Sequence, residues 1–241
     1  MTTVDIAAPH SVCDQEVAIP VGAVELAAHL RIPDHPIGIV VFAHGSGSNR
    51  HNPRNTFVVE VFAGHRLGML SIDLLTSAEA IDDAKVFDVG LLGSRLAIAR
   101  RCLRSSPICR ELPVGYFGAG SEAPAALWAA AEPRDNIRAV VVRGARPDLA
   151  GARLGNVMAP TLFVLGGLDI RVHTVNRRAA AAMRCEHRVT VLAGHGLGSA
   201  DPQTSQRAAY VAAMWFAEQL RAHRGPAAGP TQYRDVDESV G

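Results

Sequence analysis

A stretch in the middle of the chain has the layout that presents a serine nucleophile. Residues 112–131 have the sequence LPVGYFGAGSEAPAALWAAA. They predict a buried strand over Val114 to Phe117, a sharp turn of small residues from Gly118 to Glu122, and an alanine-rich helix. A strand, a tight turn and a helix in this order expose the side chain at the tip of the turn. The chemistry that such a turn supports is attack by a serine hydroxyl group.

Two registers of this turn are open. Either Gly120 lies at the tip, or Ser121 does, in the window Ala119-Gly120-Ser121-Glu122-Ala123, which has a small residue at either end. Pro124 favours Ser121: if Ser121 is the N-cap, Pro124 is the third helical residue, where a missing N–H costs no hydrogen bond. If Gly120 is the N-cap, Pro124 removes the first hydrogen bond of the helix. Whether the chain is an enzyme depends largely on this register.

Strands and helices alternate along the rest of the chain. A hairpin is predicted over Val17 to Pro20 and Val24 to Ile32, and a β-branched central strand over Ile37 to Ala43, which ends in a glycine-rich loop. Further strands are predicted over 67–74, 137–142, 160–165 and 187–192, and helices over 55–65, 87–103, 174–183 and 205–221. This alternation predicts an α/β fold, a doubly wound, mostly parallel sheet with helices on both faces and little or no lid. We expect one domain over 14–223, with disordered termini at 1–13 and 225–241.

Composition excludes several classes of function. The net charge of +1 over 241 residues gives no signal for nucleic acid or an anionic membrane surface, and no apolar run approaches the ~20 residues of a membrane span. The N-terminus lacks the features of a signal peptide, and the four cysteines form no C-x-x-C pair. We therefore expect a cytoplasmic protein with reduced thiols, no metal and no cofactor, which acts on a small-molecule substrate or ligand. The oligomeric state is left open.

The order of these parts resembles the α/β-hydrolase fold and, more narrowly, its dienelactone-hydrolase-like branch, including hydrolase domains found beside phosphoribosyltransferase domains in actinobacteria. The resemblance covers about residues 15 to 222 and rests on the stretches VVFAHGSGSNRHNPRN, SIDLLT, LPVGYFGA, RPDLAG, PTLFVLGGLD and RCE. It implies acyl transfer to serine and then hydrolysis, on an ester or a lactone. It also implies an oxyanion loop over His44 to Ser48, in which the backbone N–H groups of Gly45 and Ser46 act together with the N–H that follows the nucleophile.

The resemblance places the triad acid on Asp169, but this sequence departs from the family at the other two triad positions. Without gaps, the family's serine falls on Gly120 and its histidine on Leu197, so the site lacks both nucleophile and base. The glycine that follows the serine falls on Glu122. A displaced triad is the alternative: Ser121 is the nucleophile, His195 reaches the base position through a loop shortened by two residues, and Glu122 supplies the oxyanion N–H. Ser121, Asp169 and His195 occur in the order that the fold requires.

Basic side chains follow several of the predicted strands. The candidates for binding a substrate are Arg50, His51, Arg54, Arg143 and Arg146, and Arg171 also follows Asp169. Guanidinium groups at the carboxyl edge of a sheet suit a carboxylate or a phosphate, whereas the simpler explanation is a solvated surface. Two hypotheses result: a small serine hydrolase of an ester or lactone, perhaps anionic, or an inactive homologue that binds a ligand or a protein.

Overall fold

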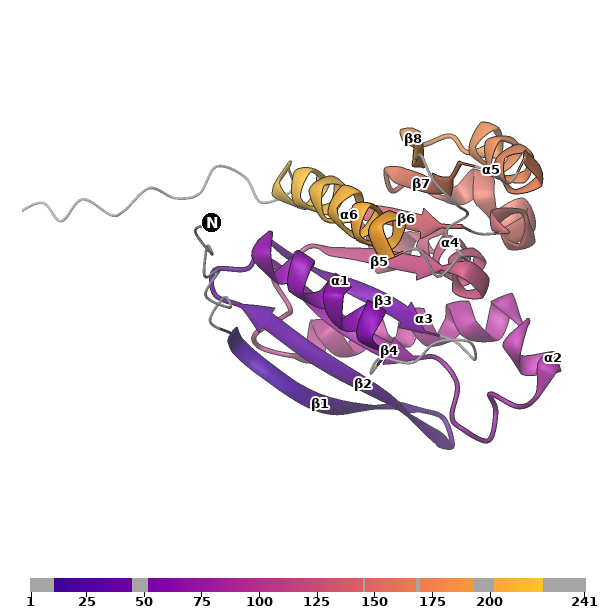
Figure 1. Ribbon diagram of the computed structural model, residues 1–241. Coiled ribbons are helices and arrows are strands. Elements are labelled where there is room, and N and C mark those ends of the chain that lie inside the picture. Colours follow the sequence, from indigo (N-terminus) through magenta and orange to yellow (C-terminus); the bar gives the residue numbers. More distant parts are fainter. Residues whose placement is uncertain (1–10, 45–51, 145, 168–169, 193–201, 223–241) are drawn as a thin grey trace, which may run out of the picture.

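The sheet of this computed structural model contains eight strands in the order β1-β2-β4-β3-β5-β6-β7-β8 (Figure 1). The structure describes residues 11–44, 52–144, 146–167, 170–192 and 202–222. β1 pairs antiparallel with β2, and β2 with β4, whereas the other neighbouring strands are parallel. The strands are β1 (Ser11–Val21), β2 (Val24–Pro33), β3 (Gly38–His44), β4 (Leu67–Asp73), β5 (Val114–Ala119), β6 (Ala139–Arg143), β7 (Thr161–Gly166) and β8 (His187–Leu192). The predicted doubly wound, mostly parallel sheet is confirmed.

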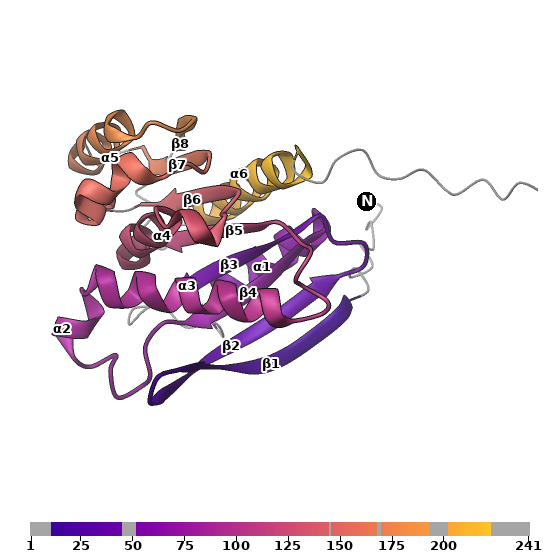
Figure 2. The same cartoon turned by 180° about the vertical axis from the view of Figure 1, so that it is seen from behind.

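Helices cover both faces of the sheet. On one face lie α1 (Pro53–Gly64) and α6 (Pro202–Ala222), which pack against each other. On the other lie α3 (Val89–Ser105), α4 (Ala123–Ala130), α5 (Ile170–Ala182) and the 3-10 segment Pro147–Asn156 (Figure 2). A short helix, α2 (Asp83–Val86), precedes α3.

Side chains of the central strands alternate between two hydrophobic clusters, because successive residues of a strand point to opposite faces. In β3, Ile39 and Val41 belong to the cluster under α3 and α4, while Val40 and Phe42 belong to the cluster under α1 and α6. Burial on both faces explains why β3 has a continuous apolar sequence rather than an alternating one.

The predicted N-terminal boundary is wrong by a few residues. β1 begins at Ser11, and Cys13 is in register with Ile32 of β2, so residues 11–13 belong to the sheet rather than to a leader. Most β1 side chains are exposed, and an exposed edge strand has little hydrophobic pattern to mark its start. In the part of the chain that the structure describes, no helix combines the length and hydropathy needed to cross a membrane.

Candidate ligand site at the carboxyl edge of the sheet

Six parallel strands end at the same edge of the sheet. β3, β4, β5, β6, β7 and β8 end at His44, Asp73, Ala119, Arg143, Gly166 and Leu192. The segments that follow these strands hold the predicted oxyanion loop, the turn, the arginines, the acid and the base. In sheets of this kind, ligands bind at this edge.

The backbone places Gly120 at the tip of the turn. Ala119 is extended, with φ −123° and ψ 140°, whereas Gly120 has φ +62°. Gly120–Glu122 then forms a 3-10 turn that leads into α4. A Cβ atom added to Gly120 would meet nothing within 4 Å, so the space of a side chain is open there. The left-handed position of the turn therefore carries no side chain.

The register that Pro124 favoured is therefore wrong. The 3-10 turn separates the tip from α4, which begins at Ala123, so that Pro124 is the second residue of this helix. The first N–H groups of any helix lack an intrahelical partner, and Pro124 fits there although Gly120 is the tip. The turn is also tight, because a Cβ on Gly118 would lie 2.7 Å from Cα of Ala123.

Ser121 and Glu122 are bound to each other. The hydroxyl group of Ser121 donates a hydrogen bond to Oε1 of Glu122. Burial raises the pKa of Glu122, and the hydrogen bond from Ser121 lowers it by less. The carboxyl group of Glu122 thus lies directly beside the predicted nucleophile.

Most other predicted site residues lie outside the described residues. These are Gly45, Ser46, Arg50, His51, Asp169, His195 and Leu197, together with the side chain of Arg54. Asp169 falls between Gly166, where β7 ends, and Ile170, where α5 begins. The catalytic roles given to Ser121, Asp169 and His195, and the oxyanion role given to Gly45 and Ser46, stay predictions.

A cavity of about 380 Å³ opens beside the turn. Gly120 and Ser121 line it together with Arg146 from the segment after β6. The remaining lining residues are Val86, Phe87, Val89, Leu92, Pro124, Gly144, Leu149 and Val172. The volume suits a small organic molecule. A second hollow, of about 480 Å³, lies between α6 and β8, away from the turn.

Arg146 and Arg143 differ in their position relative to this cavity. Arg146 lines it, and its Nε and Nη2 donate to Oδ1 and Oδ2 of Asp148 at 2.9 and 2.7 Å. Arg143 is half-buried at the end of β6 and is not among the lining residues. Of the two basic candidates whose side chains the structure describes, it brings Arg146 to the cavity, and Arg146 is paired with a carboxylate.

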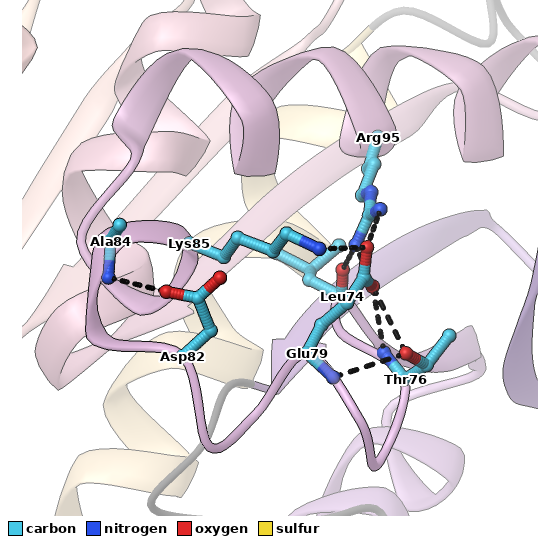
Figure 3. Close-up of polar contacts among 7 residues, drawn as sticks. All are labelled: Leu74, Thr76, Glu79, Asp82, Ala84, Lys85 and Arg95. Atoms are coloured by element: carbon cyan, nitrogen blue, oxygen red, sulfur yellow. Dashed lines mark hydrogen bonds and ion pairs between the residues drawn. The ribbon is translucent and has the colours of Figure 1, made fainter.

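The sequence analysis missed a buried ion-pair cluster that supports the wall of the cavity. Arg95 of α3 donates to both carboxylate oxygens of Glu79, at 2.7 and 2.8 Å, and Lys85 of α2 lies 3.4 Å from the same carboxylate (Figure 3). Both the N–H and the hydroxyl group of Thr76 donate to Glu79. These contacts hold the pKa of Glu79 at about 2, against an ordinary value of 4.5.

This cluster joins the cavity wall to the predicted oxyanion loop. Arg95 also donates to the carbonyl oxygen of Leu74 at 2.7 Å, and the N–H of Leu74 donates to the carbonyl oxygen of His44 at 2.8 Å. α2 ends in Val86, which lines the cavity with Phe87. Glu79 therefore fixes the segment between β4 and α3. The spacing Thr76-x-x-Glu79, typical of a capping box, is the sequence signal that could have indicated it.

A metal centre finds no support in this part of the chain. Among the described residues, no group of three or more histidine, cysteine, aspartate or glutamate side chains is arranged to hold an ion. The four cysteines are free thiols, which agrees with the absence of C-x-x-C spacing.

Comparisons with known proteins agree with this architecture. Two sequences from strains of Mycobacterium tuberculosis, both named putative phosphoribosyl transferase, are 48% identical over 217 residues, which is 90% of this chain and 49% of theirs. The chain thus spans about half the length of these curated relatives. No family model matches the sequence.

Solved structures are similar over nearly the whole chain. A dienelactone hydrolase from Anabaena variabilis is 41% identical, with a TM-score of 0.82, over 89% of this chain and all of the other. Est1E from Butyrivibrio proteoclasticus, at 13% identity and a TM-score of 0.68 over 85% of this chain and 98% of its own, shares the fold alone. Sequence identity, coverage and fold agree: the chain belongs to the dienelactone-hydrolase-like family of the α/β-hydrolase fold.

Proposed function

We propose that this chain binds a small organic molecule in the cavity beside Gly120 and forms no acyl-serine intermediate at the tip of its turn. The observation that carries this proposal is the φ of +62° at Gly120. In serine hydrolases of this fold the sharp turn exposes the nucleophile at its tip, and the N–H of the next residue stabilises the oxyanion. Glycine at the tip offers no nucleophilic atom.

The surroundings of Ser121 support the same conclusion. Ser121 lies one residue beyond the tip, in the 3-10 turn, and its hydroxyl group donates to Glu122. If Ser121 were acylated, the carboxyl group of Glu122, which accepts the hydrogen bond of Ser121, would lie beside the developing oxyanion. A carboxylate beside a developing negative charge raises the energy of the transition state.

A second candidate function is hydrolysis by the displaced triad of Ser121, Asp169 and His195. One observation favours it, because Ser121 is exposed and lines the cavity. An ester or a lactone would then be the substrate. The same experiment separates the two candidates.

The experiment is labelling with a small ethyl fluorophosphonate, read by peptide mapping, on the wild type and on Ser121→Ala. We expect no adduct at Ser121 in the wild type. Gly120→Cys is the accessibility control, since a Cβ at this position meets no atom within 4 Å. Alkylation of this cysteine by iodoacetamide would show that small reagents reach the tip. Labelling of Ser121 that disappears in Ser121→Ala and weakens in His195→Ala would contradict the proposal and establish the displaced triad.

Binding is tested with Prodan, an uncharged naphthalene dye whose emission brightens and shifts to the blue in apolar surroundings. Leu149→Asp places a carboxylate in the wall of the cavity and is expected to weaken binding at least tenfold, because an unpaired charge is poorly tolerated beside an apolar ligand. Met158→Asp is the matched control: Met158 is exposed and is not among the lining residues. Equal Prodan affinity in both variants would contradict binding at this cavity.

A further inference from the structure

We infer that the cavity selects uncharged, largely apolar ligands, and that Asp148 sets this preference by holding the guanidinium group of Arg146 in an ion pair. The inference rests on the proposed function, because it concerns the ligand of the same cavity. It differs from the expectation of an anionic ligand, which the arginines of the sequence suggested.

The chemistry of the cavity wall is the first support. Among the described lining residues, Arg146 has the single charged side chain, and Ser121 has the single hydroxyl group. Aliphatic and aromatic side chains from α2 and the residue after it, from α3, from the 3-10 segment and from α5 make up most of the remainder. The large ones include Phe87 and Leu149, which are 67% and 49% exposed. Apolar side chains left in contact with solvent at a concave site are stabilised by an apolar ligand.

The geometry of Arg146 is the second support. Two hydrogen bonds, at 2.9 and 2.7 Å, join its guanidinium group to both oxygens of Asp148. This bidentate arrangement is the same one by which arginine recognises a ligand carboxylate or phosphate. An incoming anion would therefore have to displace a partner of equal chemistry that is already in place.

The local sequence keeps this pair together. Pro147 stands between the two residues and starts the 3-10 segment Pro147–Asn156, so the backbone that joins them has a fixed φ. The hydrogen bonds from Arg146 lower the pKa of Asp148, so that its carboxylate stays ionised at neutral pH. Asp148 itself is not among the lining residues, so its substitution changes the state of Arg146 without changing the wall.

The test compares two naphthalene dyes, uncharged Prodan and anionic anilinonaphthalene sulfonate, by titration at low ionic strength. We expect the wild type to prefer Prodan. Asp148→Asn removes the competing charge and is expected to raise the affinity for the sulfonate about fivefold, with little change for Prodan. Arg146→Gln in the wild-type background is expected to change the sulfonate affinity less than twofold. In the double variant, Arg146→Gln should abolish the gain that Asp148→Asn produced.

The possible failures are distinguishable. A fivefold loss of sulfonate affinity in Arg146→Gln alone would show that Arg146 already receives anions, which overturns the inference and leaves the proposed function standing. An unchanged dye preference in Asp148→Asn, with a far-ultraviolet circular dichroism spectrum like that of the wild type, would also overturn it. Binding of neither dye, or binding that Leu149→Asp leaves unchanged, would contradict the proposed function and the inference with it.

Discussion

Removing the charge of Glu79 is expected to destabilise the protein in a pH-dependent way. Glu79→Gln keeps the size of the side chain but leaves Arg95, which is 4% exposed, without its countercharge. A buried guanidinium group that loses its ion pair is costly, because little water reaches it. Of the two hydrogen bonds that Arg95 donates to Glu79, one loses its acceptor, because glutamine has a single amide oxygen, and the other becomes weaker with a neutral acceptor.

The shift in the pKa of Glu79 gives the size of the expected loss in the free energy of unfolding. A fall from 4.5 to about 2 on folding corresponds to an upper value of ~3 kcal/mol, at 1.36 kcal/mol for each unit. Because Lys85 is 44% exposed and solvent screens its contribution, we expect a loss of about 2 kcal/mol at pH 7. The folded pKa is the lower one, so this stabilisation is complete above roughly pH 5 and disappears as the pH falls toward 2.

Urea unfolding of the wild type and of Glu79→Gln, at pH 7 and at pH 3.5, measures both quantities. The difference in the free energy of unfolding should shrink by roughly 1 kcal/mol at the lower pH. Glu111→Gln is the control, because Glu111 is 86% exposed and should change the stability by less than ~0.5 kcal/mol. A Glu79→Gln difference that is the same at both pH values would refute the electrostatic explanation, and a difference as small as that of Glu111→Gln would show that the ion-pair cluster of Glu79 does not stabilise the fold.

Three further substitutions test the packing and the turn. Gly115→Ala should cost about 1–3 kcal/mol in thermal unfolding, because the new Cβ would lie 2.5 Å from the buried ring of Phe216; an unchanged melting temperature would contradict the close contact. Gly64→Ala is its counterpart at a position where a Cβ meets no atom within 4 Å, and it should stabilise by up to about 1 kcal/mol, whereas a loss would show hidden strain. Gly120→Ala should cost about 1–2 kcal/mol through the left-handed backbone alone, and a neutral effect in urea unfolding would argue against the φ assigned to this residue.

The buried part of the fold could be predicted because its sequence repeats a simple physical pattern. β3 is apolar on both faces, and only a strand covered by helices on both sides buries such a segment. By contrast, β1 is mostly exposed, and its start is fixed by pairing with β2 rather than by hydrophobicity. The 3-10 segment Pro147–Asn156 was not predicted, since it contains Gly151 in a left-handed conformation and has no helical period.

The candidate site was less predictable, because it depends on single backbone angles and on long-range pairs. Spacing alone left both registers of the turn open, and the 3-10 turn before α4 allows Pro124 to fit although Gly120 is the tip. Glu79 and Arg95 are 16 residues apart on different elements, so no local pattern joins them. The sequence predicted that arginines follow the strands at the carboxyl edge, but the pairing of Arg146 with Asp148 depends on the 3-10 segment that begins at Pro147.

The two tryptophans of the chain give each layer of helices its own optical signal. Trp128 of α4 lies against Gly93 of α3, with the guanidinium carbon of Arg153 3.7 Å from the centre of its ring. Trp215 of α6 is buried on the opposite face of the sheet. In Trp215→Phe, the emission of Trp128 therefore reports on the layer that contains α4. In Trp128→Phe, the emission of Trp215 reports on the layer that contains α6. Coincident unfolding curves would mean that the sheet and both layers melt as one cooperative unit, and separate curves would identify which layer opens first.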